Sequence, residues 1–189
     1  MSCGSITMGS TPDCDNLPLG GTRARVGVWN YDDVLSITED QNGRVTGVTL
    51  APGATGYVFT GFRNDVQKSE EVVNPGIGIN QFRHLCRWVV YSREQEQKNN
   101  VERLSKGRFI VVVENRGKDD DAFEVLGLGV GVEIVAGAIR NAYENGGFFV
   151  LNFATPEGEF ESKLPQSLGT DYSDAVSLFE SYFPEGSGS

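Results

Sequence analysis

The sequence predicts a mainly β protein: an antiparallel β-sandwich or barrel with one flanking α-helix at about residues 92–106 and a short C-terminal helix. Three observations favour this class. Short apolar or alternating segments recur along the chain, Gly- and Asn-rich turn signals separate them, and strands do not alternate with helices as in parallel α/β folds. The 24 glycines and seven prolines among 189 residues also indicate many turns.

The length is that of one domain. Residues 1–21 are rich in Gly, Ser, Thr, Asp and Asn, and we expect them to form an extended arm. Residues 22–183 are expected to form a single β-sandwich domain with a long loop near residues 63–80, and residues 184–189 a flexible C-terminus. The polar segment from 63 to 79 is consistent with either a long loop or an extended hairpin.

The first strands are predicted from alternation and from one strong turn signal. Thr22–Asn30 alternates through Val26 and Val28. Asn42-Gly43 lies between two apolar segments, and this dipeptide suits the positive-φ positions of a type I′ hairpin turn. Further strands are expected at Val34–Thr38, Val45–Leu50 and from Tyr57.

A long strand and the main helix follow. In Gln81–Ser92, one face carries Phe82, His84, Cys86, Trp88 and Val90, and the other carries Arg83, Leu85, Arg87, Val89 and Tyr91. The second face suits a surface that something else half covers. Ser92 with Gln95 matches a capping box, and Lys106-Gly107 suits the end of the helix.

The second half contains the expected central strand. Arg108–Val113 is a continuous apolar run of mostly β-branched residues, typical of a strand buried on both faces. Later strands are expected at 122–128, 130–135 and 148–154, followed by an irregular acidic connection over 156–168. Asp171–Phe183 is the expected C-terminal helix, with Val176, Phe179 and Phe183 on one side.

The net charge is −10 and is unevenly distributed. Residues 1–113 contain 12 acidic and 12 basic side chains, whereas residues 114–189 contain 14 acidic and 4 basic ones. The acidic excess therefore lies in the last 76 residues. A basic surface for duplex DNA and a polybasic membrane anchor are not expected.

Targeting and redox features are few. No apolar run of about 18 residues predicts a membrane helix, and the first 21 residues do not predict a Sec signal peptide. Cys3, Cys14 and Cys86 do not form a disulfide scaffold. Cys3 and Cys14 are able to approach each other in the arm, but reduced thiols are expected.

Patterns that resemble ligand sites have simpler explanations. Gly127-x-Gly129-x-Gly131 resembles a phosphate loop, but no helix follows it, which favours a bulged strand. Asp119-Asp120-Asp121 with Glu124 lacks the alternating spacing of a calcium loop and suits a solvated hairpin tip.

Catalytic patterns are equally weak. His84, the one histidine, lies on an apolar face beside Cys86 and suits a core or interface imidazole. Trp29 and Trp88 suit the core better than a carbohydrate platform. Alternating Glu157, Glu159 and Glu161 suit a solvated strand edge better than glycosidase acids. We therefore expect no enzyme, no metal and no cofactor.

An arm, a long loop and segregated charge are features of assembly. Gly20–Val26 after a Cys-containing arm, Asn30-Tyr31-Asp32-Asp33, Gly107–Asn115 and Phe123–Gly131 together resemble the tail-tube (major tail) proteins of tailed bacteriophages, especially those of Bacteroidetes-type hosts. The resemblance covers most of residues 18–155. It implies a β-sandwich or barrel subunit, six copies of which form a ring joined by their strands. The rings are expected to stack into a DNA-conducting tube, bridged by the arm and by residues 63–80.

The resemblance also implies partners and a location. These are other copies of the chain, tape-measure, baseplate or tail-terminator proteins, and transiting DNA without specific binding; the location is the virion tail, assembled in the host cytoplasm, with no membrane. Candidate inter-subunit contacts are Arg23, Arg25, Phe62, Arg63, Val72, Val73, Arg83 and Arg87. Candidate acidic lumen or stacking residues are Asp119, Asp120, Asp121, Glu124 and Glu133.

The sequence leaves two alternatives open. One is another tail or head-completion structural protein. The other is a carbohydrate-binding β-sandwich module that uses Trp29 or Trp88 with the acidic loop.

Overall fold

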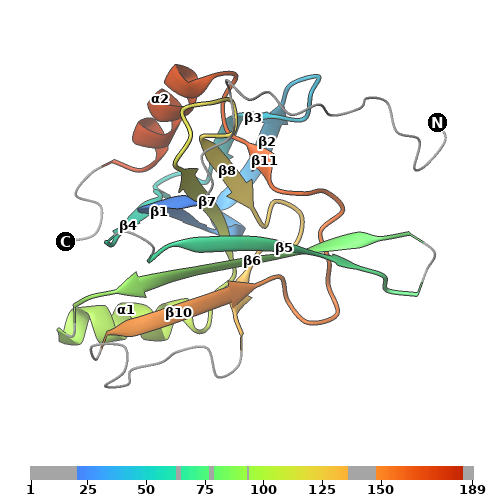
Figure 1. Cartoon of the computed structure of the whole chain (residues 1–189). Helices are drawn as coiled ribbons and strands as arrows, with labels where there is room; N and C mark the ends of the chain where they lie inside the picture. Colours follow the sequence, from blue (N-terminus) through green and yellow to red (C-terminus); the bar gives the residue numbers. More distant parts are fainter. Residues whose placement is uncertain (1–20, 63–64, 77–78, 93, 136–147, 185–189) are drawn as a thin grey trace.

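Antiparallel strands dominate the fold, as the sequence predicts, and two α-helices flank them (Figure 1). The computed structural model describes residues 21–62, 65–76, 79–92, 94–135 and 148–184. Two sheets pack face to face, and a two-stranded hairpin and the C-terminal helix cover the other side of the larger sheet. No helix in these ranges is long and apolar enough to cross a membrane.

The larger sheet has five strands in the order β11-β8-β7-β1-β4, all antiparallel to their neighbours. Strand β7 is central, and Val26 and Val28 of β1 lie opposite Val113 and Val111 of β7. The strand bounds are β1 Thr22–Asn30, β4 Tyr57–Thr60, β7 Phe109–Asn115, β8 Phe123–Leu126 and β11 Gln166–Ser167.

The smaller sheet has four strands in the order β5-β6-β10-β9, and β2 and β3 form a separate hairpin. A short 3-10 helix, η1 (Tyr31–Asp33), joins β1 to β2. The remaining bounds are β2 Val34–Glu39, β3 Val45–Leu50, β5 Gln67–Val73, β6 Gln81–Val90, β9 Glu133–Ile134, β10 Phe149–Ala154, α1 Gln95–Leu104 and α2 Tyr172–Tyr182.

Strand β7 is buried on both faces, which confirms the interpretation of the apolar run at 108–113. Phe109, Val111 and Val113 pack between the two sheets, together with Trp88, Phe153 and the apolar side of α1. Ile110 and Val112 point the other way, into a second core beneath α2 and the β2–β3 hairpin. The alternation of side chains along one strand thus supplies both cores.

Helix α2 closes the second core through close approach to two glycines. Asp171 caps the helix, since its carboxylate accepts a hydrogen bond from the N–H of Asp174 at 2.9 Å. The ring of Phe183, just after α2, lies on Gly27 and Gly56, where an added Cβ would meet ring atoms at 2.7 and 2.3 Å. Only glycine at these positions allows Phe183 to reach the sheet.

The expected capping box at Ser92 is wrong. Helix α1 begins later, at Gln95, with Glu94 in an extended conformation as its N-cap residue. The Ser92 hydroxyl accepts a hydrogen bond from the N–H of Glu94 (3.3 Å), so it does not cap the helix. Helix α1 is therefore shorter than the range of 92–106 that the sequence predicts.

The Asn42-Gly43 hairpin forms, but not through a type I′ turn. The N–H of Gly43 donates to the carbonyl of Asp40 (3.1 Å), which places Gln41 and Asn42 at the centre of the turn. The Asp40 carboxylate accepts hydrogen bonds from the N–H groups of Arg44 (2.9 Å) and Asn42 (2.8 Å). These bonds, with Arg44 first, lower the pKa of Asp40 and favour a longer loop.

Of the two interpretations of residues 63–79, the structure shows the extended hairpin. Strand β5 pairs with β6 over seven residues, from Gln67 opposite Arg87 to Val73 opposite Gln81. The sequence pattern did not clearly predict β5, because β5 is an edge strand whose side chains are mostly polar and exposed.

Replacing Phe183 by alanine tests the closure by α2. We expect Phe183→Ala to lower the free energy of unfolding by about 3–5 kcal/mol, because it leaves a cavity above two glycines that cannot fill it. Phe62→Ala, at a side chain that is 70% exposed, is the matched control and should change it by less than about 0.5 kcal/mol. Urea denaturation followed by circular dichroism measures both, and equal effects would contradict this role of Phe183.

Candidate assembly surface

Strand β5 is the outer strand of its sheet, because in the described part of the chain it pairs with β6 alone. Figure 1 shows β5 and β6 continuing past the sandwich as a projecting hairpin. An edge strand presents backbone N–H and C=O groups that another strand can pair with. The β5–β6 hairpin is therefore a surface on which a second chain is able to extend the sheet.

Large apolar side chains are exposed in and beside this hairpin. Val72 on β5 is 66% exposed, and Ile79 near the tip is 61% exposed. Phe62 precedes β5 and packs edge-on against Tyr91, with ring centroids 4.9 Å apart. Val72 and Ile79 thus lie near the tip of the hairpin, whereas Phe62 and Tyr91 lie at its other end, and exposed apolar groups of this kind are typical of interaction surfaces. The other exposed large apolar side chains of the described residues, Leu35, Tyr57 and Leu164, lie on other segments.

Glu161, which is 3% exposed, holds the hairpin near its tip, where Phe82 of β6 lies opposite Val72 of β5. Its backbone exchanges two hydrogen bonds with Phe82 of β6, at 2.9 and 2.8 Å. Its carboxylate accepts hydrogen bonds from the N–H groups of Gly129 (2.9 Å) and Val130 (3.0 Å). We call this arrangement the Glu161 anchor. The glycine-rich segment thus forms a turn that holds an anion, and the anion is a carboxylate of the same chain.

The prediction of a solvated strand edge is wrong for Glu161. Residues 157–159 form an exposed turn, in which Glu159 makes a two-pronged ion pair with Arg108 (both 3.0 Å). Alternation in the sequence did not distinguish Glu161 from its neighbours. The signal that identifies it is the turn at 127–131, which offers free N–H groups to a carboxylate.

His84 lies beside the Glu161 anchor and is a buried imidazole, as the sequence predicts. Its Nδ1 accepts a hydrogen bond from the N–H of Gly127 (3.2 Å), so Nε2 carries the proton and donates to the carbonyl of Lys163 (3.0 Å). This arrangement fits the neutral ring. Burial lowers the pKa of His84, while the nearby carboxylates of Glu161 and Glu70 oppose that shift.

An ion pair joins the two sheets behind the hairpin. The Lys68 ammonium on β5 contacts Glu124 of β8 and lies 3.3 Å from Glu70. Glu124 also accepts a hydrogen bond from Asn115 (2.5 Å). Glu124, a candidate lumen residue, is therefore engaged between the sheets, and its side chain is mostly covered.

The predicted contact residues fall into two groups. Arg23 and Arg25 both pair with buried Glu114, at 3.4 and 2.9 Å, and Arg25 also lies over the ring of Phe179. The remaining described members lie in or beside the smaller sheet: Phe62, Val72, Val73, Arg83 and Arg87. Arg63 lies outside the described residues.

The predicted acidic residues are also dispersed. Asp119, Asp120 and Asp121 form the exposed β7–β8 turn, where Asp120 pairs with Arg44 at 2.5 Å. Glu133 lies on β9 and is half-buried. Among the described residues, no group of three or more His, Cys, Asp or Glu side chains is arranged to hold a metal ion.

The uneven charge has an explanation within the subunit. Among the described residues, five ion pairs join a base from residues 1–113 to an acid from residues 114–189. The acidic half of the sequence thus neutralises much of the basic charge of the first half. The carboxylates that remain for contacts with other molecules include Asp119 and Asp121.

Both tryptophans lie in the core, each 1% exposed, as the core interpretation predicts. Trp88 stacks on Phe153 with ring centroids 4.0 Å apart, and Trp29 packs against Phe183 at 4.5 Å. Neither indole faces solvent, so neither offers a platform to a sugar ring.

Comparison with known proteins gives no match, because no family model, no curated protein and no solved structure is similar to this chain at a significant level. A functional interpretation therefore depends on the surfaces described above.

The neutral His84 makes stability depend on pH. Because burial lowers its pKa in the folded state, the unfolded chain binds the proton more readily below about pH 6.5. We expect the free energy of unfolding to fall between pH 7 and pH 5, by at most about 1.4 kcal/mol per pH unit. Urea denaturation over this range measures the slope.

The control for this prediction is His84→Gln, which cannot titrate. In this variant the free energy of unfolding should fall less steeply between pH 7 and pH 5 than in the unaltered protein, because residue 84 no longer takes up a proton. The charged residues around position 84, Glu161, Glu70, Lys68 and Lys163, are the same in both proteins. Identical slopes in the two proteins would show that protonation of His84 does not limit stability.

Proposed function

We propose that this protein is a virion structural protein: a subunit of a bacteriophage tail tube, built of stacked hexameric rings, through which DNA passes. The observation that carries the proposal is the β5–β6 hairpin, which combines an edge strand with exposed Val72 and Ile79. A monomer leaves this surface exposed to solvent. Ring formation covers it and removes the edge.

The sandwich provides what such a subunit needs. Two cores share β7, and the Glu161 anchor together with the Lys68–Glu124 pair holds the hairpin at a fixed angle to them. A rigid hairpin loses little conformational entropy when it pairs with a neighbour. The resemblance in sequence described above points to the same kind of subunit.

The charge suits a conduit for DNA. Basic residues bind phosphates by releasing counterions, and such binding would retard DNA in transit. In this chain many bases are already paired with carboxylates of the same subunit, and the net charge is −10. Proposed partners are further copies of the chain and tape-measure, baseplate or tail-terminator proteins, with the virion tail as the location.

A different tail or head-completion protein would use the same hairpin without forming tubes. For the carbohydrate-binding alternative, the residues first considered, Trp29 and Trp88, are buried, and no other observation favours it.

Electron microscopy of the full-length protein over a range of concentrations tests the proposal. We expect rings or tubes, and we expect Val72→Lys to abolish them, because a charge on an edge strand opposes pairing with another strand. Leu35→Lys places the same charge on an equally exposed apolar side chain of β2 and should assemble normally.

Both variants should keep the stability of the original chain within about 0.5 kcal/mol, because both side chains are exposed. A protein that stays monomeric at all concentrations, or Val72→Lys assembling as well as Leu35→Lys, would count against the proposal.

A further inference from the structure

The outer face of the smaller sheet contains a cavity of about 390 Å³. Strands β5, β6 and β10 form its floor, with Gln67, Ser69, Arg83, Leu85, Arg87 and Asn152 among its lining residues. Arg83 and Arg87 stand on the same face of β6, opposite Glu71 and Gln67 of β5. Two guanidinium groups therefore belong to one hollow on the surface.

The charge of this cavity is incompletely balanced. Its described lining residues include no Asp or Glu. Arg83 lies 3.9 Å from Glu71, at the limit of an ion pair, and the Nε of Arg87 is buried with no hydrogen-bond partner in the described part of the chain. A buried donor without a partner is costly, and a guanidinium is best satisfied by a carboxylate or a phosphate.

The β7–β8 turn carries groups of the complementary charge. Asp119, Asp120 and Asp121 are consecutive and exposed there. Asp120 pairs with Arg44, whereas Asp119 and Asp121 make no ion pair with another described residue. Their carboxylates are thus available to an arginine of another molecule.

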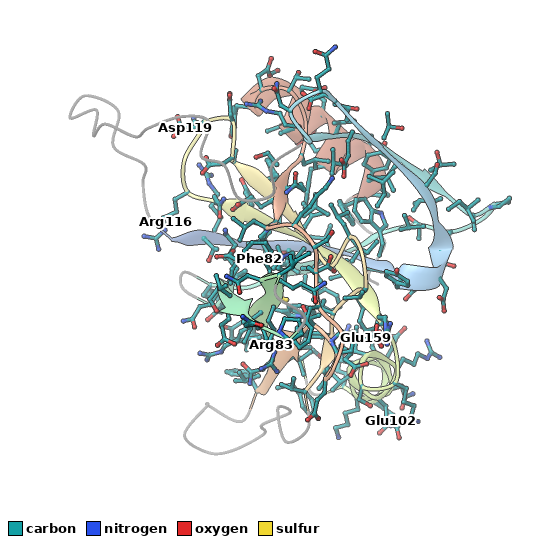
Figure 2. All side chains as sticks on the ribbon, turned by 90° about the vertical axis from the view of Figure 1, so that its right-hand side faces the viewer. Phe82, Arg83, Glu102, Arg116, Asp119 and Glu159 are labelled. Carbon is teal, nitrogen blue, oxygen red and sulfur yellow. The ribbon has the colours of Figure 1, made fainter. Side chains whose placement is uncertain are left out.

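The turn and the cavity lie far apart in one subunit. Figure 2 shows Asp119 towards the upper end of the molecule and Arg83 in its lower half. The two surfaces therefore meet only between copies. A contact between two different surfaces of identical chains is head-to-tail, and it either closes into a ring or repeats as a stack. Because the β5 edge is proposed to close the ring, this second contact is left for stacking.

We propose that the Asp119–Asp121 turn of one copy docks into the Arg83–Arg87 cavity of the next, and that this contact joins successive rings. The occupant is a second copy of this chain, chosen by charge complementarity. The inference rests on the proposed tube. It names the side chains that join one ring to the next, whereas the β5 edge joins neighbouring subunits within a ring.

A charge exchange tests the contact. Asp119→Lys with Asp121→Lys reverses the turn, and Arg83→Glu with Arg87→Glu reverses the cavity. Each double variant alone should form no stacks, with the association constant between rings lowered at least about 30-fold. An equal mixture of the two should stack again, because each reversed surface then finds its complement. Sedimentation velocity and electron microscopy measure both results.

The controls separate this contact from general effects of charge. Glu96→Lys with Glu102→Lys makes the same change of charge on exposed positions of α1 and should stack normally. The turn variant alters only exposed side chains, so we expect it to fold normally. The cavity variant places two carboxylates on the sheet and is the one whose folding needs a check. If the Arg83→Glu with Arg87→Glu variant does not fold, Arg83→Gln with Arg87→Gln is used in its place, and it should also weaken stacking.

The outcomes are distinguishable. If rings stack as before in every variant, or if the mixture does not restore stacking, this contact is overturned while the proposed tube stands. If the original chain forms neither rings nor tubes, the proposed function and the contact both fail. If the cavity variants keep stacking but lose binding to a short DNA duplex, the ligand of the cavity is phosphate and the inference is wrong.

Discussion

Burial of β7 on both faces is the constraint on which the rest of the structure depends. Its odd-numbered side chains complete the core between the sheets, and its even-numbered ones complete the core beneath α2. Residues 109–113 are all apolar, because an unpaired polar group on either face would lose its hydrogen bonds to water, and the buried Glu114 that follows is paired with Arg23 and Arg25. The hairpin, the helices and the acidic turn are all positioned relative to this strand.

The Glu161 anchor fixes the projecting hairpin to the larger sheet. It connects β6 to the turn at 127–131, which follows β8, the neighbour of β7. Its carboxylate is buried, yet backbone N–H groups satisfy it, so the cost of burying a charge is offset by hydrogen bonds to that charge. A surface proposed to pair with other subunits is in this way held by polar contacts inside its own subunit.

The sequence predicted the elements whose buried side chains recur at the spacing of a strand or a helix. The apolar run of β7, the alternation of β6 and the apolar side of α2 all appear in the structure. Features decided by tertiary contacts were not predicted. Ser92 had the right spacing for a cap, yet α1 starts after Glu94. Glu161 had the same alternating pattern as its exposed neighbours, yet a turn distant in sequence buries it. Of the proposed contact surfaces, Val72, Arg83 and Arg87 were named from the sequence. The pairing of Arg25 with Glu114 and of Glu124 with Lys68 within the subunit was not predicted.

The position of Phe183 has a consequence for synthesis. Strand β1 is able to pair with β4 once residue 60 has been made, but its second partner, β7, begins only at residue 109, and Gly27 of β1 is covered only when Phe183 has been made. Contacts between residues so far apart in sequence form slowly, because a long loop must close first. The core beneath α2 therefore closes late, after the strands that it covers have been made.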